Sequence, residues 1–380
     1  MDEKTYVLLL STSKIILERR YILKSSKKIV ICMLLIVVSI ISLTLINTST
    51  NKTFKYKGST IALTIDGNSA TSFPTSGKYN VTVNCNNAKG RWNPKTWKLE
   101  ITKITGTVTC DVSFNSSVSN LTTQVNNKAT RDENGRRYQG KNPDNYIWFN
   151  DELWRIIGNI PVCLTSGCST TENRVKIIRN DSIGAIKYGD NSTWTGSNIQ
   201  SLLNTCYLGK TSSCDSYCYS YSTKAKGLCD YSSDGIDTTD FYGNMVEDVY
   251  FNVGVPSSSS YVNADDQYTK EIATHATSAS KIGLMYASDW GYAIEGFTGI
   301  LGYDGNPQNS SDKNWLFSNG LERTMSAYSS SNPLSVSGDG YLINNPALRG
   351  LSIRPVLYLK SNVYVVSGKG TKVDPYRIGM

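Results

Sequence analysis

Residues 146–158, YIWFNDELWRIIG, contain the clearest local fold signal in this chain. Two runs rich in aromatic and β-branched residues, 146–149 and 153–158, flank the polar dipeptide Asn150-Asp151. Two such runs joined by a short polar turn are typical of a β-hairpin. We therefore predict an antiparallel hairpin here, within a domain that is rich in β-structure.

Strand-like runs continue from this hairpin to the C-terminus, with long connections rich in Gly, Ser and Asn between them. Ile199, Leu202, Leu203 and Cys206 recur at helical spacing, and Ser197 is a suitable N-cap. Many short strands with one or two helices predict an α+β domain over residues 138–380. The predicted elements are strands at 174–179, 281–287, 338–343, 352–359 and 362–366, helices at 198–208 and 271–276, and a turn at 288–292.

A second, smaller domain is predicted over residues 54–114. Its strand candidates, in which apolar and polar residues alternate, are 60–65, 79–84, 97–104 and 107–114. We predict a small antiparallel, Ig-like β-domain with Trp92 and Trp97 in its core, acting as a spacer. Residues 115–137 lack apolar periodicity and are predicted to be a linker.

An apolar segment precedes both domains. Ile29–Ile46 contains no charged residue, Pro or Gly over 18 residues. As a helix this segment would be about 27 Å long, close to the thickness of a bilayer core of about 30 Å. Cations are more frequent before it than after it, so residues 1–28 are predicted to be a cytoplasmic tail and the rest extracellular. The prediction is a single-pass plasma-membrane protein with an uncleaved signal-anchor. The alternative is a cleaved signal peptide and a secreted protein.

Charge and composition narrow the classes of partner. The net charge of +8 is shared between the short tail and a long remainder, and no clustered basic stretch suggests nucleic-acid binding. The chain contains 24 Tyr against 8 Phe, and Tyr suits both half-buried strands and binding surfaces.

The cysteines favour disulfides over metal binding. Eight of the nine lie after the apolar segment, whereas Cys32 lies within it, and an even number in an exported chain is typical of disulfides. We predict the pairs Cys85–Cys110 and Cys163–Cys168, and leave the pairing of the other four open. Those four are Cys206, Cys214, Cys218 and Cys229.

Residues 211–233 combine three Cys with four Tyr among Ser and Gly, a composition found in binding loops. We predict ligand contacts at Tyr217, Tyr219, Tyr221, Trp290 and Tyr292. The alternative is a disulfide-tethered surface loop without a binding role.

We predict no cofactor and no metal. The weaker alternative is a calcium ion at Asp234, Asp237 and Asp240.

Three segments resemble an uncharacterised domain family found on membrane-anchored proteins of low-GC Gram-positive bacteria, often behind small β-domains. They are YIWFNDELWRIIG at 146–158, KIGLMYASDWGYA at 281–293, and the C-terminal IRPVLYLKSNVYVVSGKGTKVDPYRI at 353–378. The family is distantly similar to the formylglycine-generating-enzyme branch of the C-type-lectin fold. The resemblance implies a two-sheet core with long surface loops, and Arg354-Pro355 is similar to the Arg before that fold's last strands.

Catalytic patterns are weak. Formylglycine-generating enzymes use cysteines late in the domain, and here none follows Cys229. His275 is the only histidine and has no nucleophile motif beside it, and the adjacent acids Asp265 and Asp266 point to opposite faces of a strand. The function we expect is a membrane-anchored extracellular binding protein for a glycan or a protein, and not an enzyme. The alternatives are an extracellular carbohydrate hydrolase and a passive envelope or pilus-like component.

Overall fold

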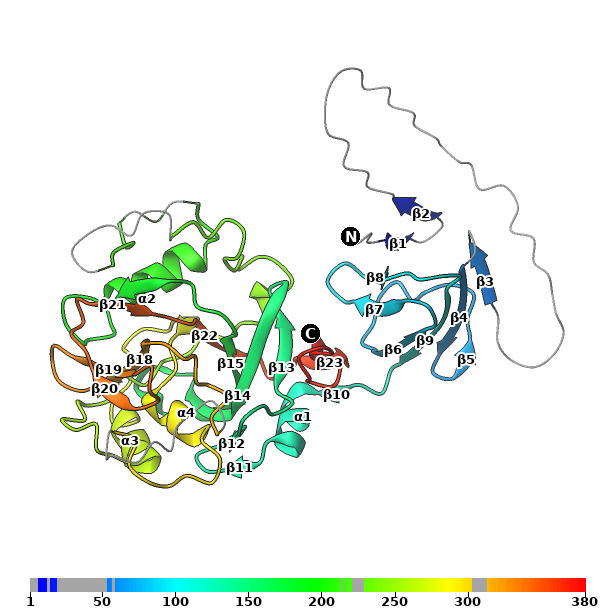
Figure 1. The fold of residues 1–380 in the computed structure, drawn as a ribbon. Coiled ribbons are helices and arrows are strands. Elements are labelled where there is room, and N and C mark those ends of the chain that lie inside the picture. The colour runs from blue at the N-terminus through cyan, green and yellow to red at the C-terminus, as the bar shows by residue number, and fades with distance from the viewer. Residues whose placement is uncertain are drawn as a thin grey trace, which may run out of the picture. The chain divides into compact units, whose positions relative to one another are not determined.

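The computed structural model describes residues 6–11, 14–18, 53–56, 59–212, 214, 216–220, 229–302 and 313–380. The chain forms two compact units, Met1–Ser117 and Val118–Met380 (Figure 1). Each unit has its own sheets.

The secondary structure is mainly β, with 35% strand and 13% helix in several sheets. None of the helices in the described ranges has the length and apolar character needed to cross a bilayer. This finding contradicts the predicted fold class, which began with a transmembrane helix, and the predicted single-pass localisation. The segment on which both rested, Ile29–Ile46, lies outside the described residues.

The first unit is built from two sheets. One has the strand order β2-β1-β8-β7, and the other has the order β3-β4-β9-β6 with β5 paired to β4. The predicted tail, 1–28, was expected to lack a core, yet it supplies β1 and β2, and β1 pairs with β8. The strands are β1 Tyr6–Ser11, β2 Lys14–Glu18, β3 Thr53–Tyr56, β4 Ser59–Ile65, β5 Asn68–Ser69, β6 Asn80–Cys85, β7 Lys89–Asn93, β8 Lys98–Thr102 and β9 Thr109–Asn115.

Aromatic packing forms the core of the first unit. The Trp92 and Phe114 rings meet edge to face with centroids 4.8 Å apart, and both residues are buried. Trp97, predicted to be core, is only half-buried, because a left-handed backbone at this residue (φ 57°) ends the β7–β8 turn and its indole donates to the Pro74 carbonyl. The prediction of a purely antiparallel domain is also wrong, because β4 and β9 pair in parallel.

The predicted hairpin opens the main sheet of the second unit. β13 Tyr146–Phe149 pairs antiparallel with β14 Glu152–Cys163, and Phe149 faces Glu152 across the turn. Asn150 and Asp151 have φ values of 53° and 61°, the left-handed pair that a two-residue hairpin turn requires. The prediction of the hairpin is therefore confirmed.

The main sheet has seven strands in the order β11-β12-β14-β15-β22-β17, with β13 beside β14. Its first two strands are β11 Arg131–Asp132 and β12 Arg136–Arg137. A second sheet of five strands has the order β16-β21-β18-β19-β20. The further strands are β15 Thr171–Arg179, β16 Ala185–Lys187, β17 Ile282–Gly283, β18 Glu322–Ala327, β19 Pro333–Val336, β20 Leu342–Asn344, β21 Gly350–Ser352 and β22 Val356–Leu359.

Short helices join these sheets, and α4 packs against β18 and β19 (Figure 1). The predicted helix at 198–208 is present as α2 followed by a π-helix, and the Ser197 hydroxyl caps it by accepting from the Gln200 backbone N–H. The helices are α1 Leu121–Lys128, α2 Asn198–Ser201, α3 Ala264–Glu271, α4 Ala287–Tyr292, the π-helix Leu202–Tyr207, and 3-10 turns at Ser166–Cys168 and Gly243–Met245.

The segment predicted as a linker, 115–137, belongs mostly to the second unit. It holds α1 and the strands β10 Ser119–Asn120, β11 Arg131–Asp132 and β12 Arg136–Arg137. β10 pairs with β23 Tyr364–Ser367, which in turn pairs with β24 Arg377–Gly379. The two sequence ends of this unit are therefore hydrogen-bonded to each other, a long-range pairing that a search for local periodicity does not detect.

Candidate functional site

A polar groove opens beside the start of α2. It has a volume of about 390 Å³, and its walls come from β16, the turn after it, the start of α2 and the segment around Tyr217. The lining carries amide, hydroxyl, ammonium and carboxylate groups next to one aromatic ring. The residues that carry them include Lys187, Asp190, Asn191, Thr195, Asn198 and Tyr217.

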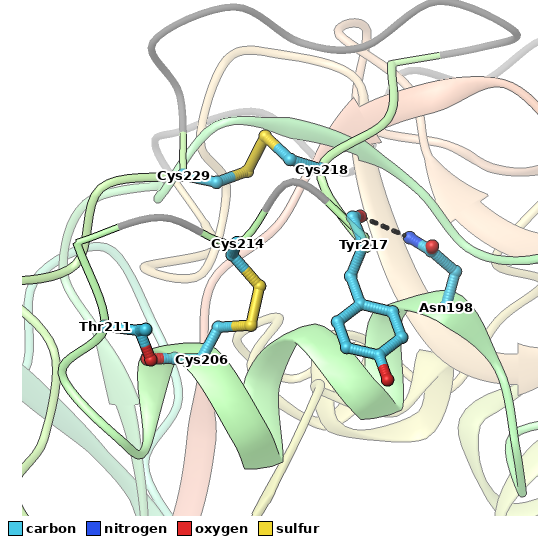
Figure 2. Close-up of a disulfide and its surroundings, with 7 residues drawn as sticks. All are labelled: Asn198, Cys206, Thr211, Cys214, Tyr217, Cys218 and Cys229. Atoms are coloured by element: carbon cyan, nitrogen blue, oxygen red, sulfur yellow. Dashed lines mark hydrogen bonds between the residues drawn. A yellow bond between two sulfur atoms is a disulfide. The ribbon is translucent and has the colours of Figure 1, made fainter.

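Backbone and side-chain hydrogen bonds hold the two walls together. The Asn198 amide group donates to the Tyr217 carbonyl at 2.7 Å, as Figure 2 shows, and the Lys187 backbone N–H donates to the Tyr219 carbonyl at 2.8 Å. The Lys187 ammonium lies 3.3 Å from an Asp190 oxygen and 5.0 Å from the centre of the Tyr219 ring. Lys187 and Asp190 therefore form an ion pair at this wall, and the Tyr219 ring lies against the lysine.

Two disulfides restrain the segment that carries Tyr217. Cys206 pairs with Cys214, and Cys218, the residue directly after Tyr217, pairs with Cys229 (Figure 2). The Cys214 bridge ties the segment to the π-helix that continues α2. Tyr217 is therefore held from both sides in sequence, which lowers the entropy that a ligand would have to remove on binding.

The cysteines pair as disulfides throughout the described chain. The predicted pairs Cys85–Cys110 and Cys163–Cys168 are confirmed. Cys85 and Cys110 face each other across β6 and β9, which explains why a bridge forms between strands that are not adjacent in sequence.

The structure separates the five predicted ligand contacts. Tyr217 lines the groove, and Tyr219 is half-buried over Lys187. Tyr221 lies outside the described residues. Trp290 and Tyr292 were predicted to contact a ligand, but each is 0% exposed and belongs to the core. The stretch predicted as a turn is helix α4, and its six residues are all buried. A helix this short shows too little periodicity to be found from sequence.

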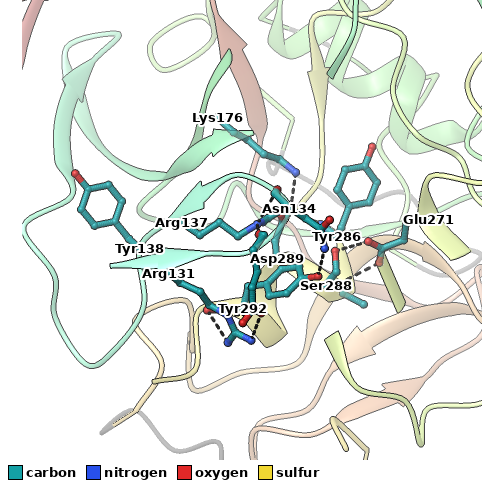
Figure 3. Close-up of polar contacts among 12 residues, drawn as sticks. Arg131, Asn134, Arg137, Tyr138, Lys176, Glu271, Tyr286, Ser288, Asp289 and Tyr292 are labelled. Atoms are coloured by element: carbon teal, nitrogen blue, oxygen red, sulfur yellow. Dashed lines mark hydrogen bonds and ion pairs between the residues drawn. The ribbon is translucent and has the colours of Figure 1, made fainter. Parts of the chain in front are cut away.

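Instead, α4 carries the centre of a buried ionic cluster, which we define as Asp289, Lys176 and Arg137 (Figure 3). The Asp289 carboxylate lies 2.5 Å from the Lys176 ammonium and 2.8 Å from the Arg137 guanidinium. It also accepts from the Tyr286 backbone N–H at 2.9 Å. The three charged side chains are at most 2% exposed, so no substrate reaches them in this conformation.

A second buried carboxylate, Glu271 at the end of α3, lies next to this cluster. It accepts from the Ser288 backbone N–H and hydroxyl, and from the Ser326 hydroxyl at 2.5 Å (Figure 3). Gln267 donates to it as well, at 3.1 Å. Because every contact is internal, the cluster and Glu271 join α3 and α4 to the main sheet and are not an open catalytic site.

The cluster makes stability depend on pH. Burial alone would raise the pKa of Asp289, but the charges of Lys176 and Arg137 outweigh burial and hold that pKa below its ordinary value. A carboxyl with a lowered folded-state pKa stabilises the fold above its unfolded pKa of about 3.9, and this contribution is lost as the pH falls through the folded pKa. We expect the free energy of unfolding to fall from about pH 5 downward.

Urea titrations across this range measure the effect. The Asp289→Asn variant keeps the contributions of the other carboxyls, so its acid slope should be shallower than that of the parent chain. Glu271 has the opposite effect on the pH dependence, because burial raises its folded-state pKa above the ordinary carboxyl value. Its contribution to stability is present at low pH and is lost as the pH rises through that raised pKa. Equal acid slopes for the two proteins would contradict the assignment.

Among the residues that the structure describes, one group of candidate metal ligands comes together. The Cys163 and Cys168 sulfurs and an imidazole nitrogen of His275 all lie within 4.8 Å of one another. The two sulfurs form a disulfide here and offer no thiolates in this state. Burial lowers the pKa of His275, which favours the neutral imidazole that binds metals. His275 was predicted within a helix, but α3 ends at Glu271 and His275 bridges to Asn252.

The predicted calcium ligands are engaged separately. Asp234 accepts from Arg179 at 3.3 Å, Asp237 from Thr239, and Asp240 from the Tyr242 and Gly243 backbone. Asp265 accepts from the Tyr292 hydroxyl at 2.6 Å. Each of these acids therefore makes its own internal contacts, at different positions in the second unit.

Comparisons with known protein families, with curated proteins and with solved structures find no match to this chain.

Proposed function

We propose that this protein is an extracellular binding protein, and that its second unit binds a glycan in the polar groove beside α2. The observation that carries the proposal is the lining itself. Polar groups of Asp190, Asn198 and Lys187 line the same groove as Tyr217, and disulfides restrain the segment that carries Tyr217. Sugars present hydroxyls around an apolar ring face, and this combination of groups complements them.

Groove size and polarity favour a small saccharide over a protein ligand. A volume of about 390 Å³ lies within the range of small-molecule sites. The anchors of protein interfaces are buried aromatic and apolar groups in a largely dry centre, whereas this lining is mainly polar. Four disulfides support export to an oxidising environment.

Binding is favoured over cleavage by the number of acids. Glycoside hydrolases generally use two carboxylates on either side of the scissile bond. Among the described residues that line the groove, Asp190 alone carries a carboxylate. We therefore propose recognition without hydrolysis.

A glycan array with the purified chain tests the proposal, followed by calorimetry with the best-bound saccharide. We expect Asp190→Ala to weaken binding by about tenfold, or about 1.4 kcal/mol, because a charged hydrogen-bond partner of the ligand is removed. Tyr217→Ala should weaken binding at least as much. Asp266→Ala is the matched control, since Asp266 is an exposed acid on α3 that does not line the groove.

Two results would count against the proposal. One is the absence of any bound saccharide at high display density. The other is a saccharide bound with the same affinity by the parent chain, Asp190→Ala and Tyr217→Ala, which would place its site elsewhere.

A further inference from the structure

The only histidine of the chain lies beside a disulfide that the groove does not use. An imidazole nitrogen of His275 and the sulfurs of Cys163 and Cys168 are within 4.8 Å of one another. The two sulfurs are bonded to each other, so opening the disulfide would leave two thiols next to the imidazole, which are three ligand types that zinc accepts.

Backbone pairing holds the three side chains in place. Cys163, at the end of β14, accepts at its carbonyl from the Tyr250 N–H at 2.9 Å. Two residues further on, Asn252 bridges to His275, and the Ala276 N–H donates to the Phe251 carbonyl at 2.8 Å. The strand end, the 250–252 segment and the histidine segment therefore form one continuous ladder. A site on such a ladder is preorganised, because its ligands need no large rearrangement to converge.

This disulfide is also the most accessible one in the second unit. Cys168 is half-buried at the tip of the β14–β15 hairpin, whereas Cys206, Cys214, Cys218 and Cys229 are all buried. It closes the shortest loop, with a sequence separation of 5. A short loop gains the least from cross-linking, so opening this bridge costs the fold less than opening the others. Cys168 has a φ of 56°, a backbone conformation that residues other than Gly and Asn adopt rarely.

We propose that Cys163, Cys168 and His275 form a zinc site that is gated by reduction of the disulfide. A small dithiol supplies two electrons and two protons. Its thiolate attacks the accessible Cys168 sulfur, the Cys163–Cys168 bond breaks, and the second dithiol sulfur closes a new disulfide, so that the protein gains two thiols. Zinc then displaces both thiol protons and takes the lone pair of the neutral imidazole.

The donor set leaves one coordination position open. Two thiolates and one imidazole hold zinc in sites that keep a water or a substrate as the fourth ligand. In the oxidised state the same cysteines staple the hairpin and bind no metal. The site therefore reports the redox state of its surroundings through the ion it holds.

The test uses the full chain after limited reduction by a dithiol. Alkylation and mass spectrometry identify preparations in which Cys163 and Cys168 are the opened pair, and zinc is then titrated into them. We expect one zinc ion per chain, protection of both thiols from alkylation, and thiolate-to-metal charge-transfer absorption when cobalt(II) replaces zinc. The oxidised chain should bind neither metal at this position.

His275→Ala tests the third ligand with the disulfide still available. We expect its reduced form to bind zinc about tenfold more weakly or worse, which corresponds to about 1.4 kcal/mol. Thr277→Ala is the matched control, an exposed residue on the same segment, and should bind as the parent does. Circular dichroism checks that each variant is folded. Equal zinc affinity for the parent and His275→Ala, or equal affinity for the oxidised and reduced chains, would overturn the proposal.

Discussion

Replacing Asp289 with Asn is expected to lower the free energy of unfolding of the second unit by about 3–5 kcal/mol, the cost of removing one partner from a buried ion pair. Asp289 neutralises two cations at once, at 2.5 Å from Lys176 and 2.8 Å from Arg137. Asn keeps the shape of the side chain but removes the charge. Both cations would then remain buried without a counter-ion.

The measurement is urea unfolding of the parent and variant chains, in which the transition of the second unit should move and that of the first unit should not. Asp132→Asn is a matched control. Its carboxylate pairs with Arg136 at 3.2 Å, but its side chain is 74% exposed. Exposed pairs contribute about 0–1 kcal/mol, so this variant should stay within that range. An Asp289→Asn chain that is as stable as the control would show that the cluster does not stabilise the fold.

Replacing Glu322 with Gln is expected to cost about 3 kcal/mol, somewhat less than the first substitution because a single cation is left unpaired. Glu322 opens β18 and holds Arg354 through two oxygens, at 2.7 and 2.9 Å. The pair is buried, and Arg354 also donates to the Leu316 carbonyl at 2.7 Å. This bidentate contact joins the second sheet to the segment that leads into β22.

Thermal and urea unfolding of Glu322→Gln measure this contribution, and Glu172→Gln is the control. Glu172 pairs with Arg174 at 2.7 Å but is 52% exposed, so its loss should cost less than about 1 kcal/mol. The outcome that would contradict the interpretation is an equal effect of the two substitutions. Partial rescue of Glu322→Gln by Arg354→Met would further support it, because Met removes the unpaired buried charge.

These buried charges also show where reasoning from sequence stopped. Lys176 lies in a run of alternating cations, RVKIIR at 174–179, which correctly predicted a strand. Side chains alternate between the two faces of a strand, but this alternation does not say that the lysine is buried. Its acceptor, Asp289, is 113 residues away in a helix of six residues. No local pattern connects the two.

The same limit applies to the candidate groove. The Tyr-rich, Cys-rich segment drew attention to Tyr217 and Tyr219 from composition alone. Asp190, Thr195 and Asn198 were missed, because Ser, Thr, Asn and Gly in a connection are typical of any surface turn. Trp290 and Tyr292 were chosen by residue type and are buried. Residue type alone does not distinguish an aromatic contact surface from an aromatic core.

Some features could be predicted from residues adjacent in the chain, since turn and capping preferences act over a few positions. They are hairpin β13–β14, the strand at 174–179 and the N-cap of α2. The even set of eight cysteines after the apolar segment likewise predicted disulfides. Three other features depended on burial and long-range packing. They are the pairing of the two ends of the second unit, the ion pairs of Asp289 with its two cations, and the contact of His275 with Cys163–Cys168. Those contacts form only when the whole core is assembled, because their energy comes from neighbours that are distant in the chain.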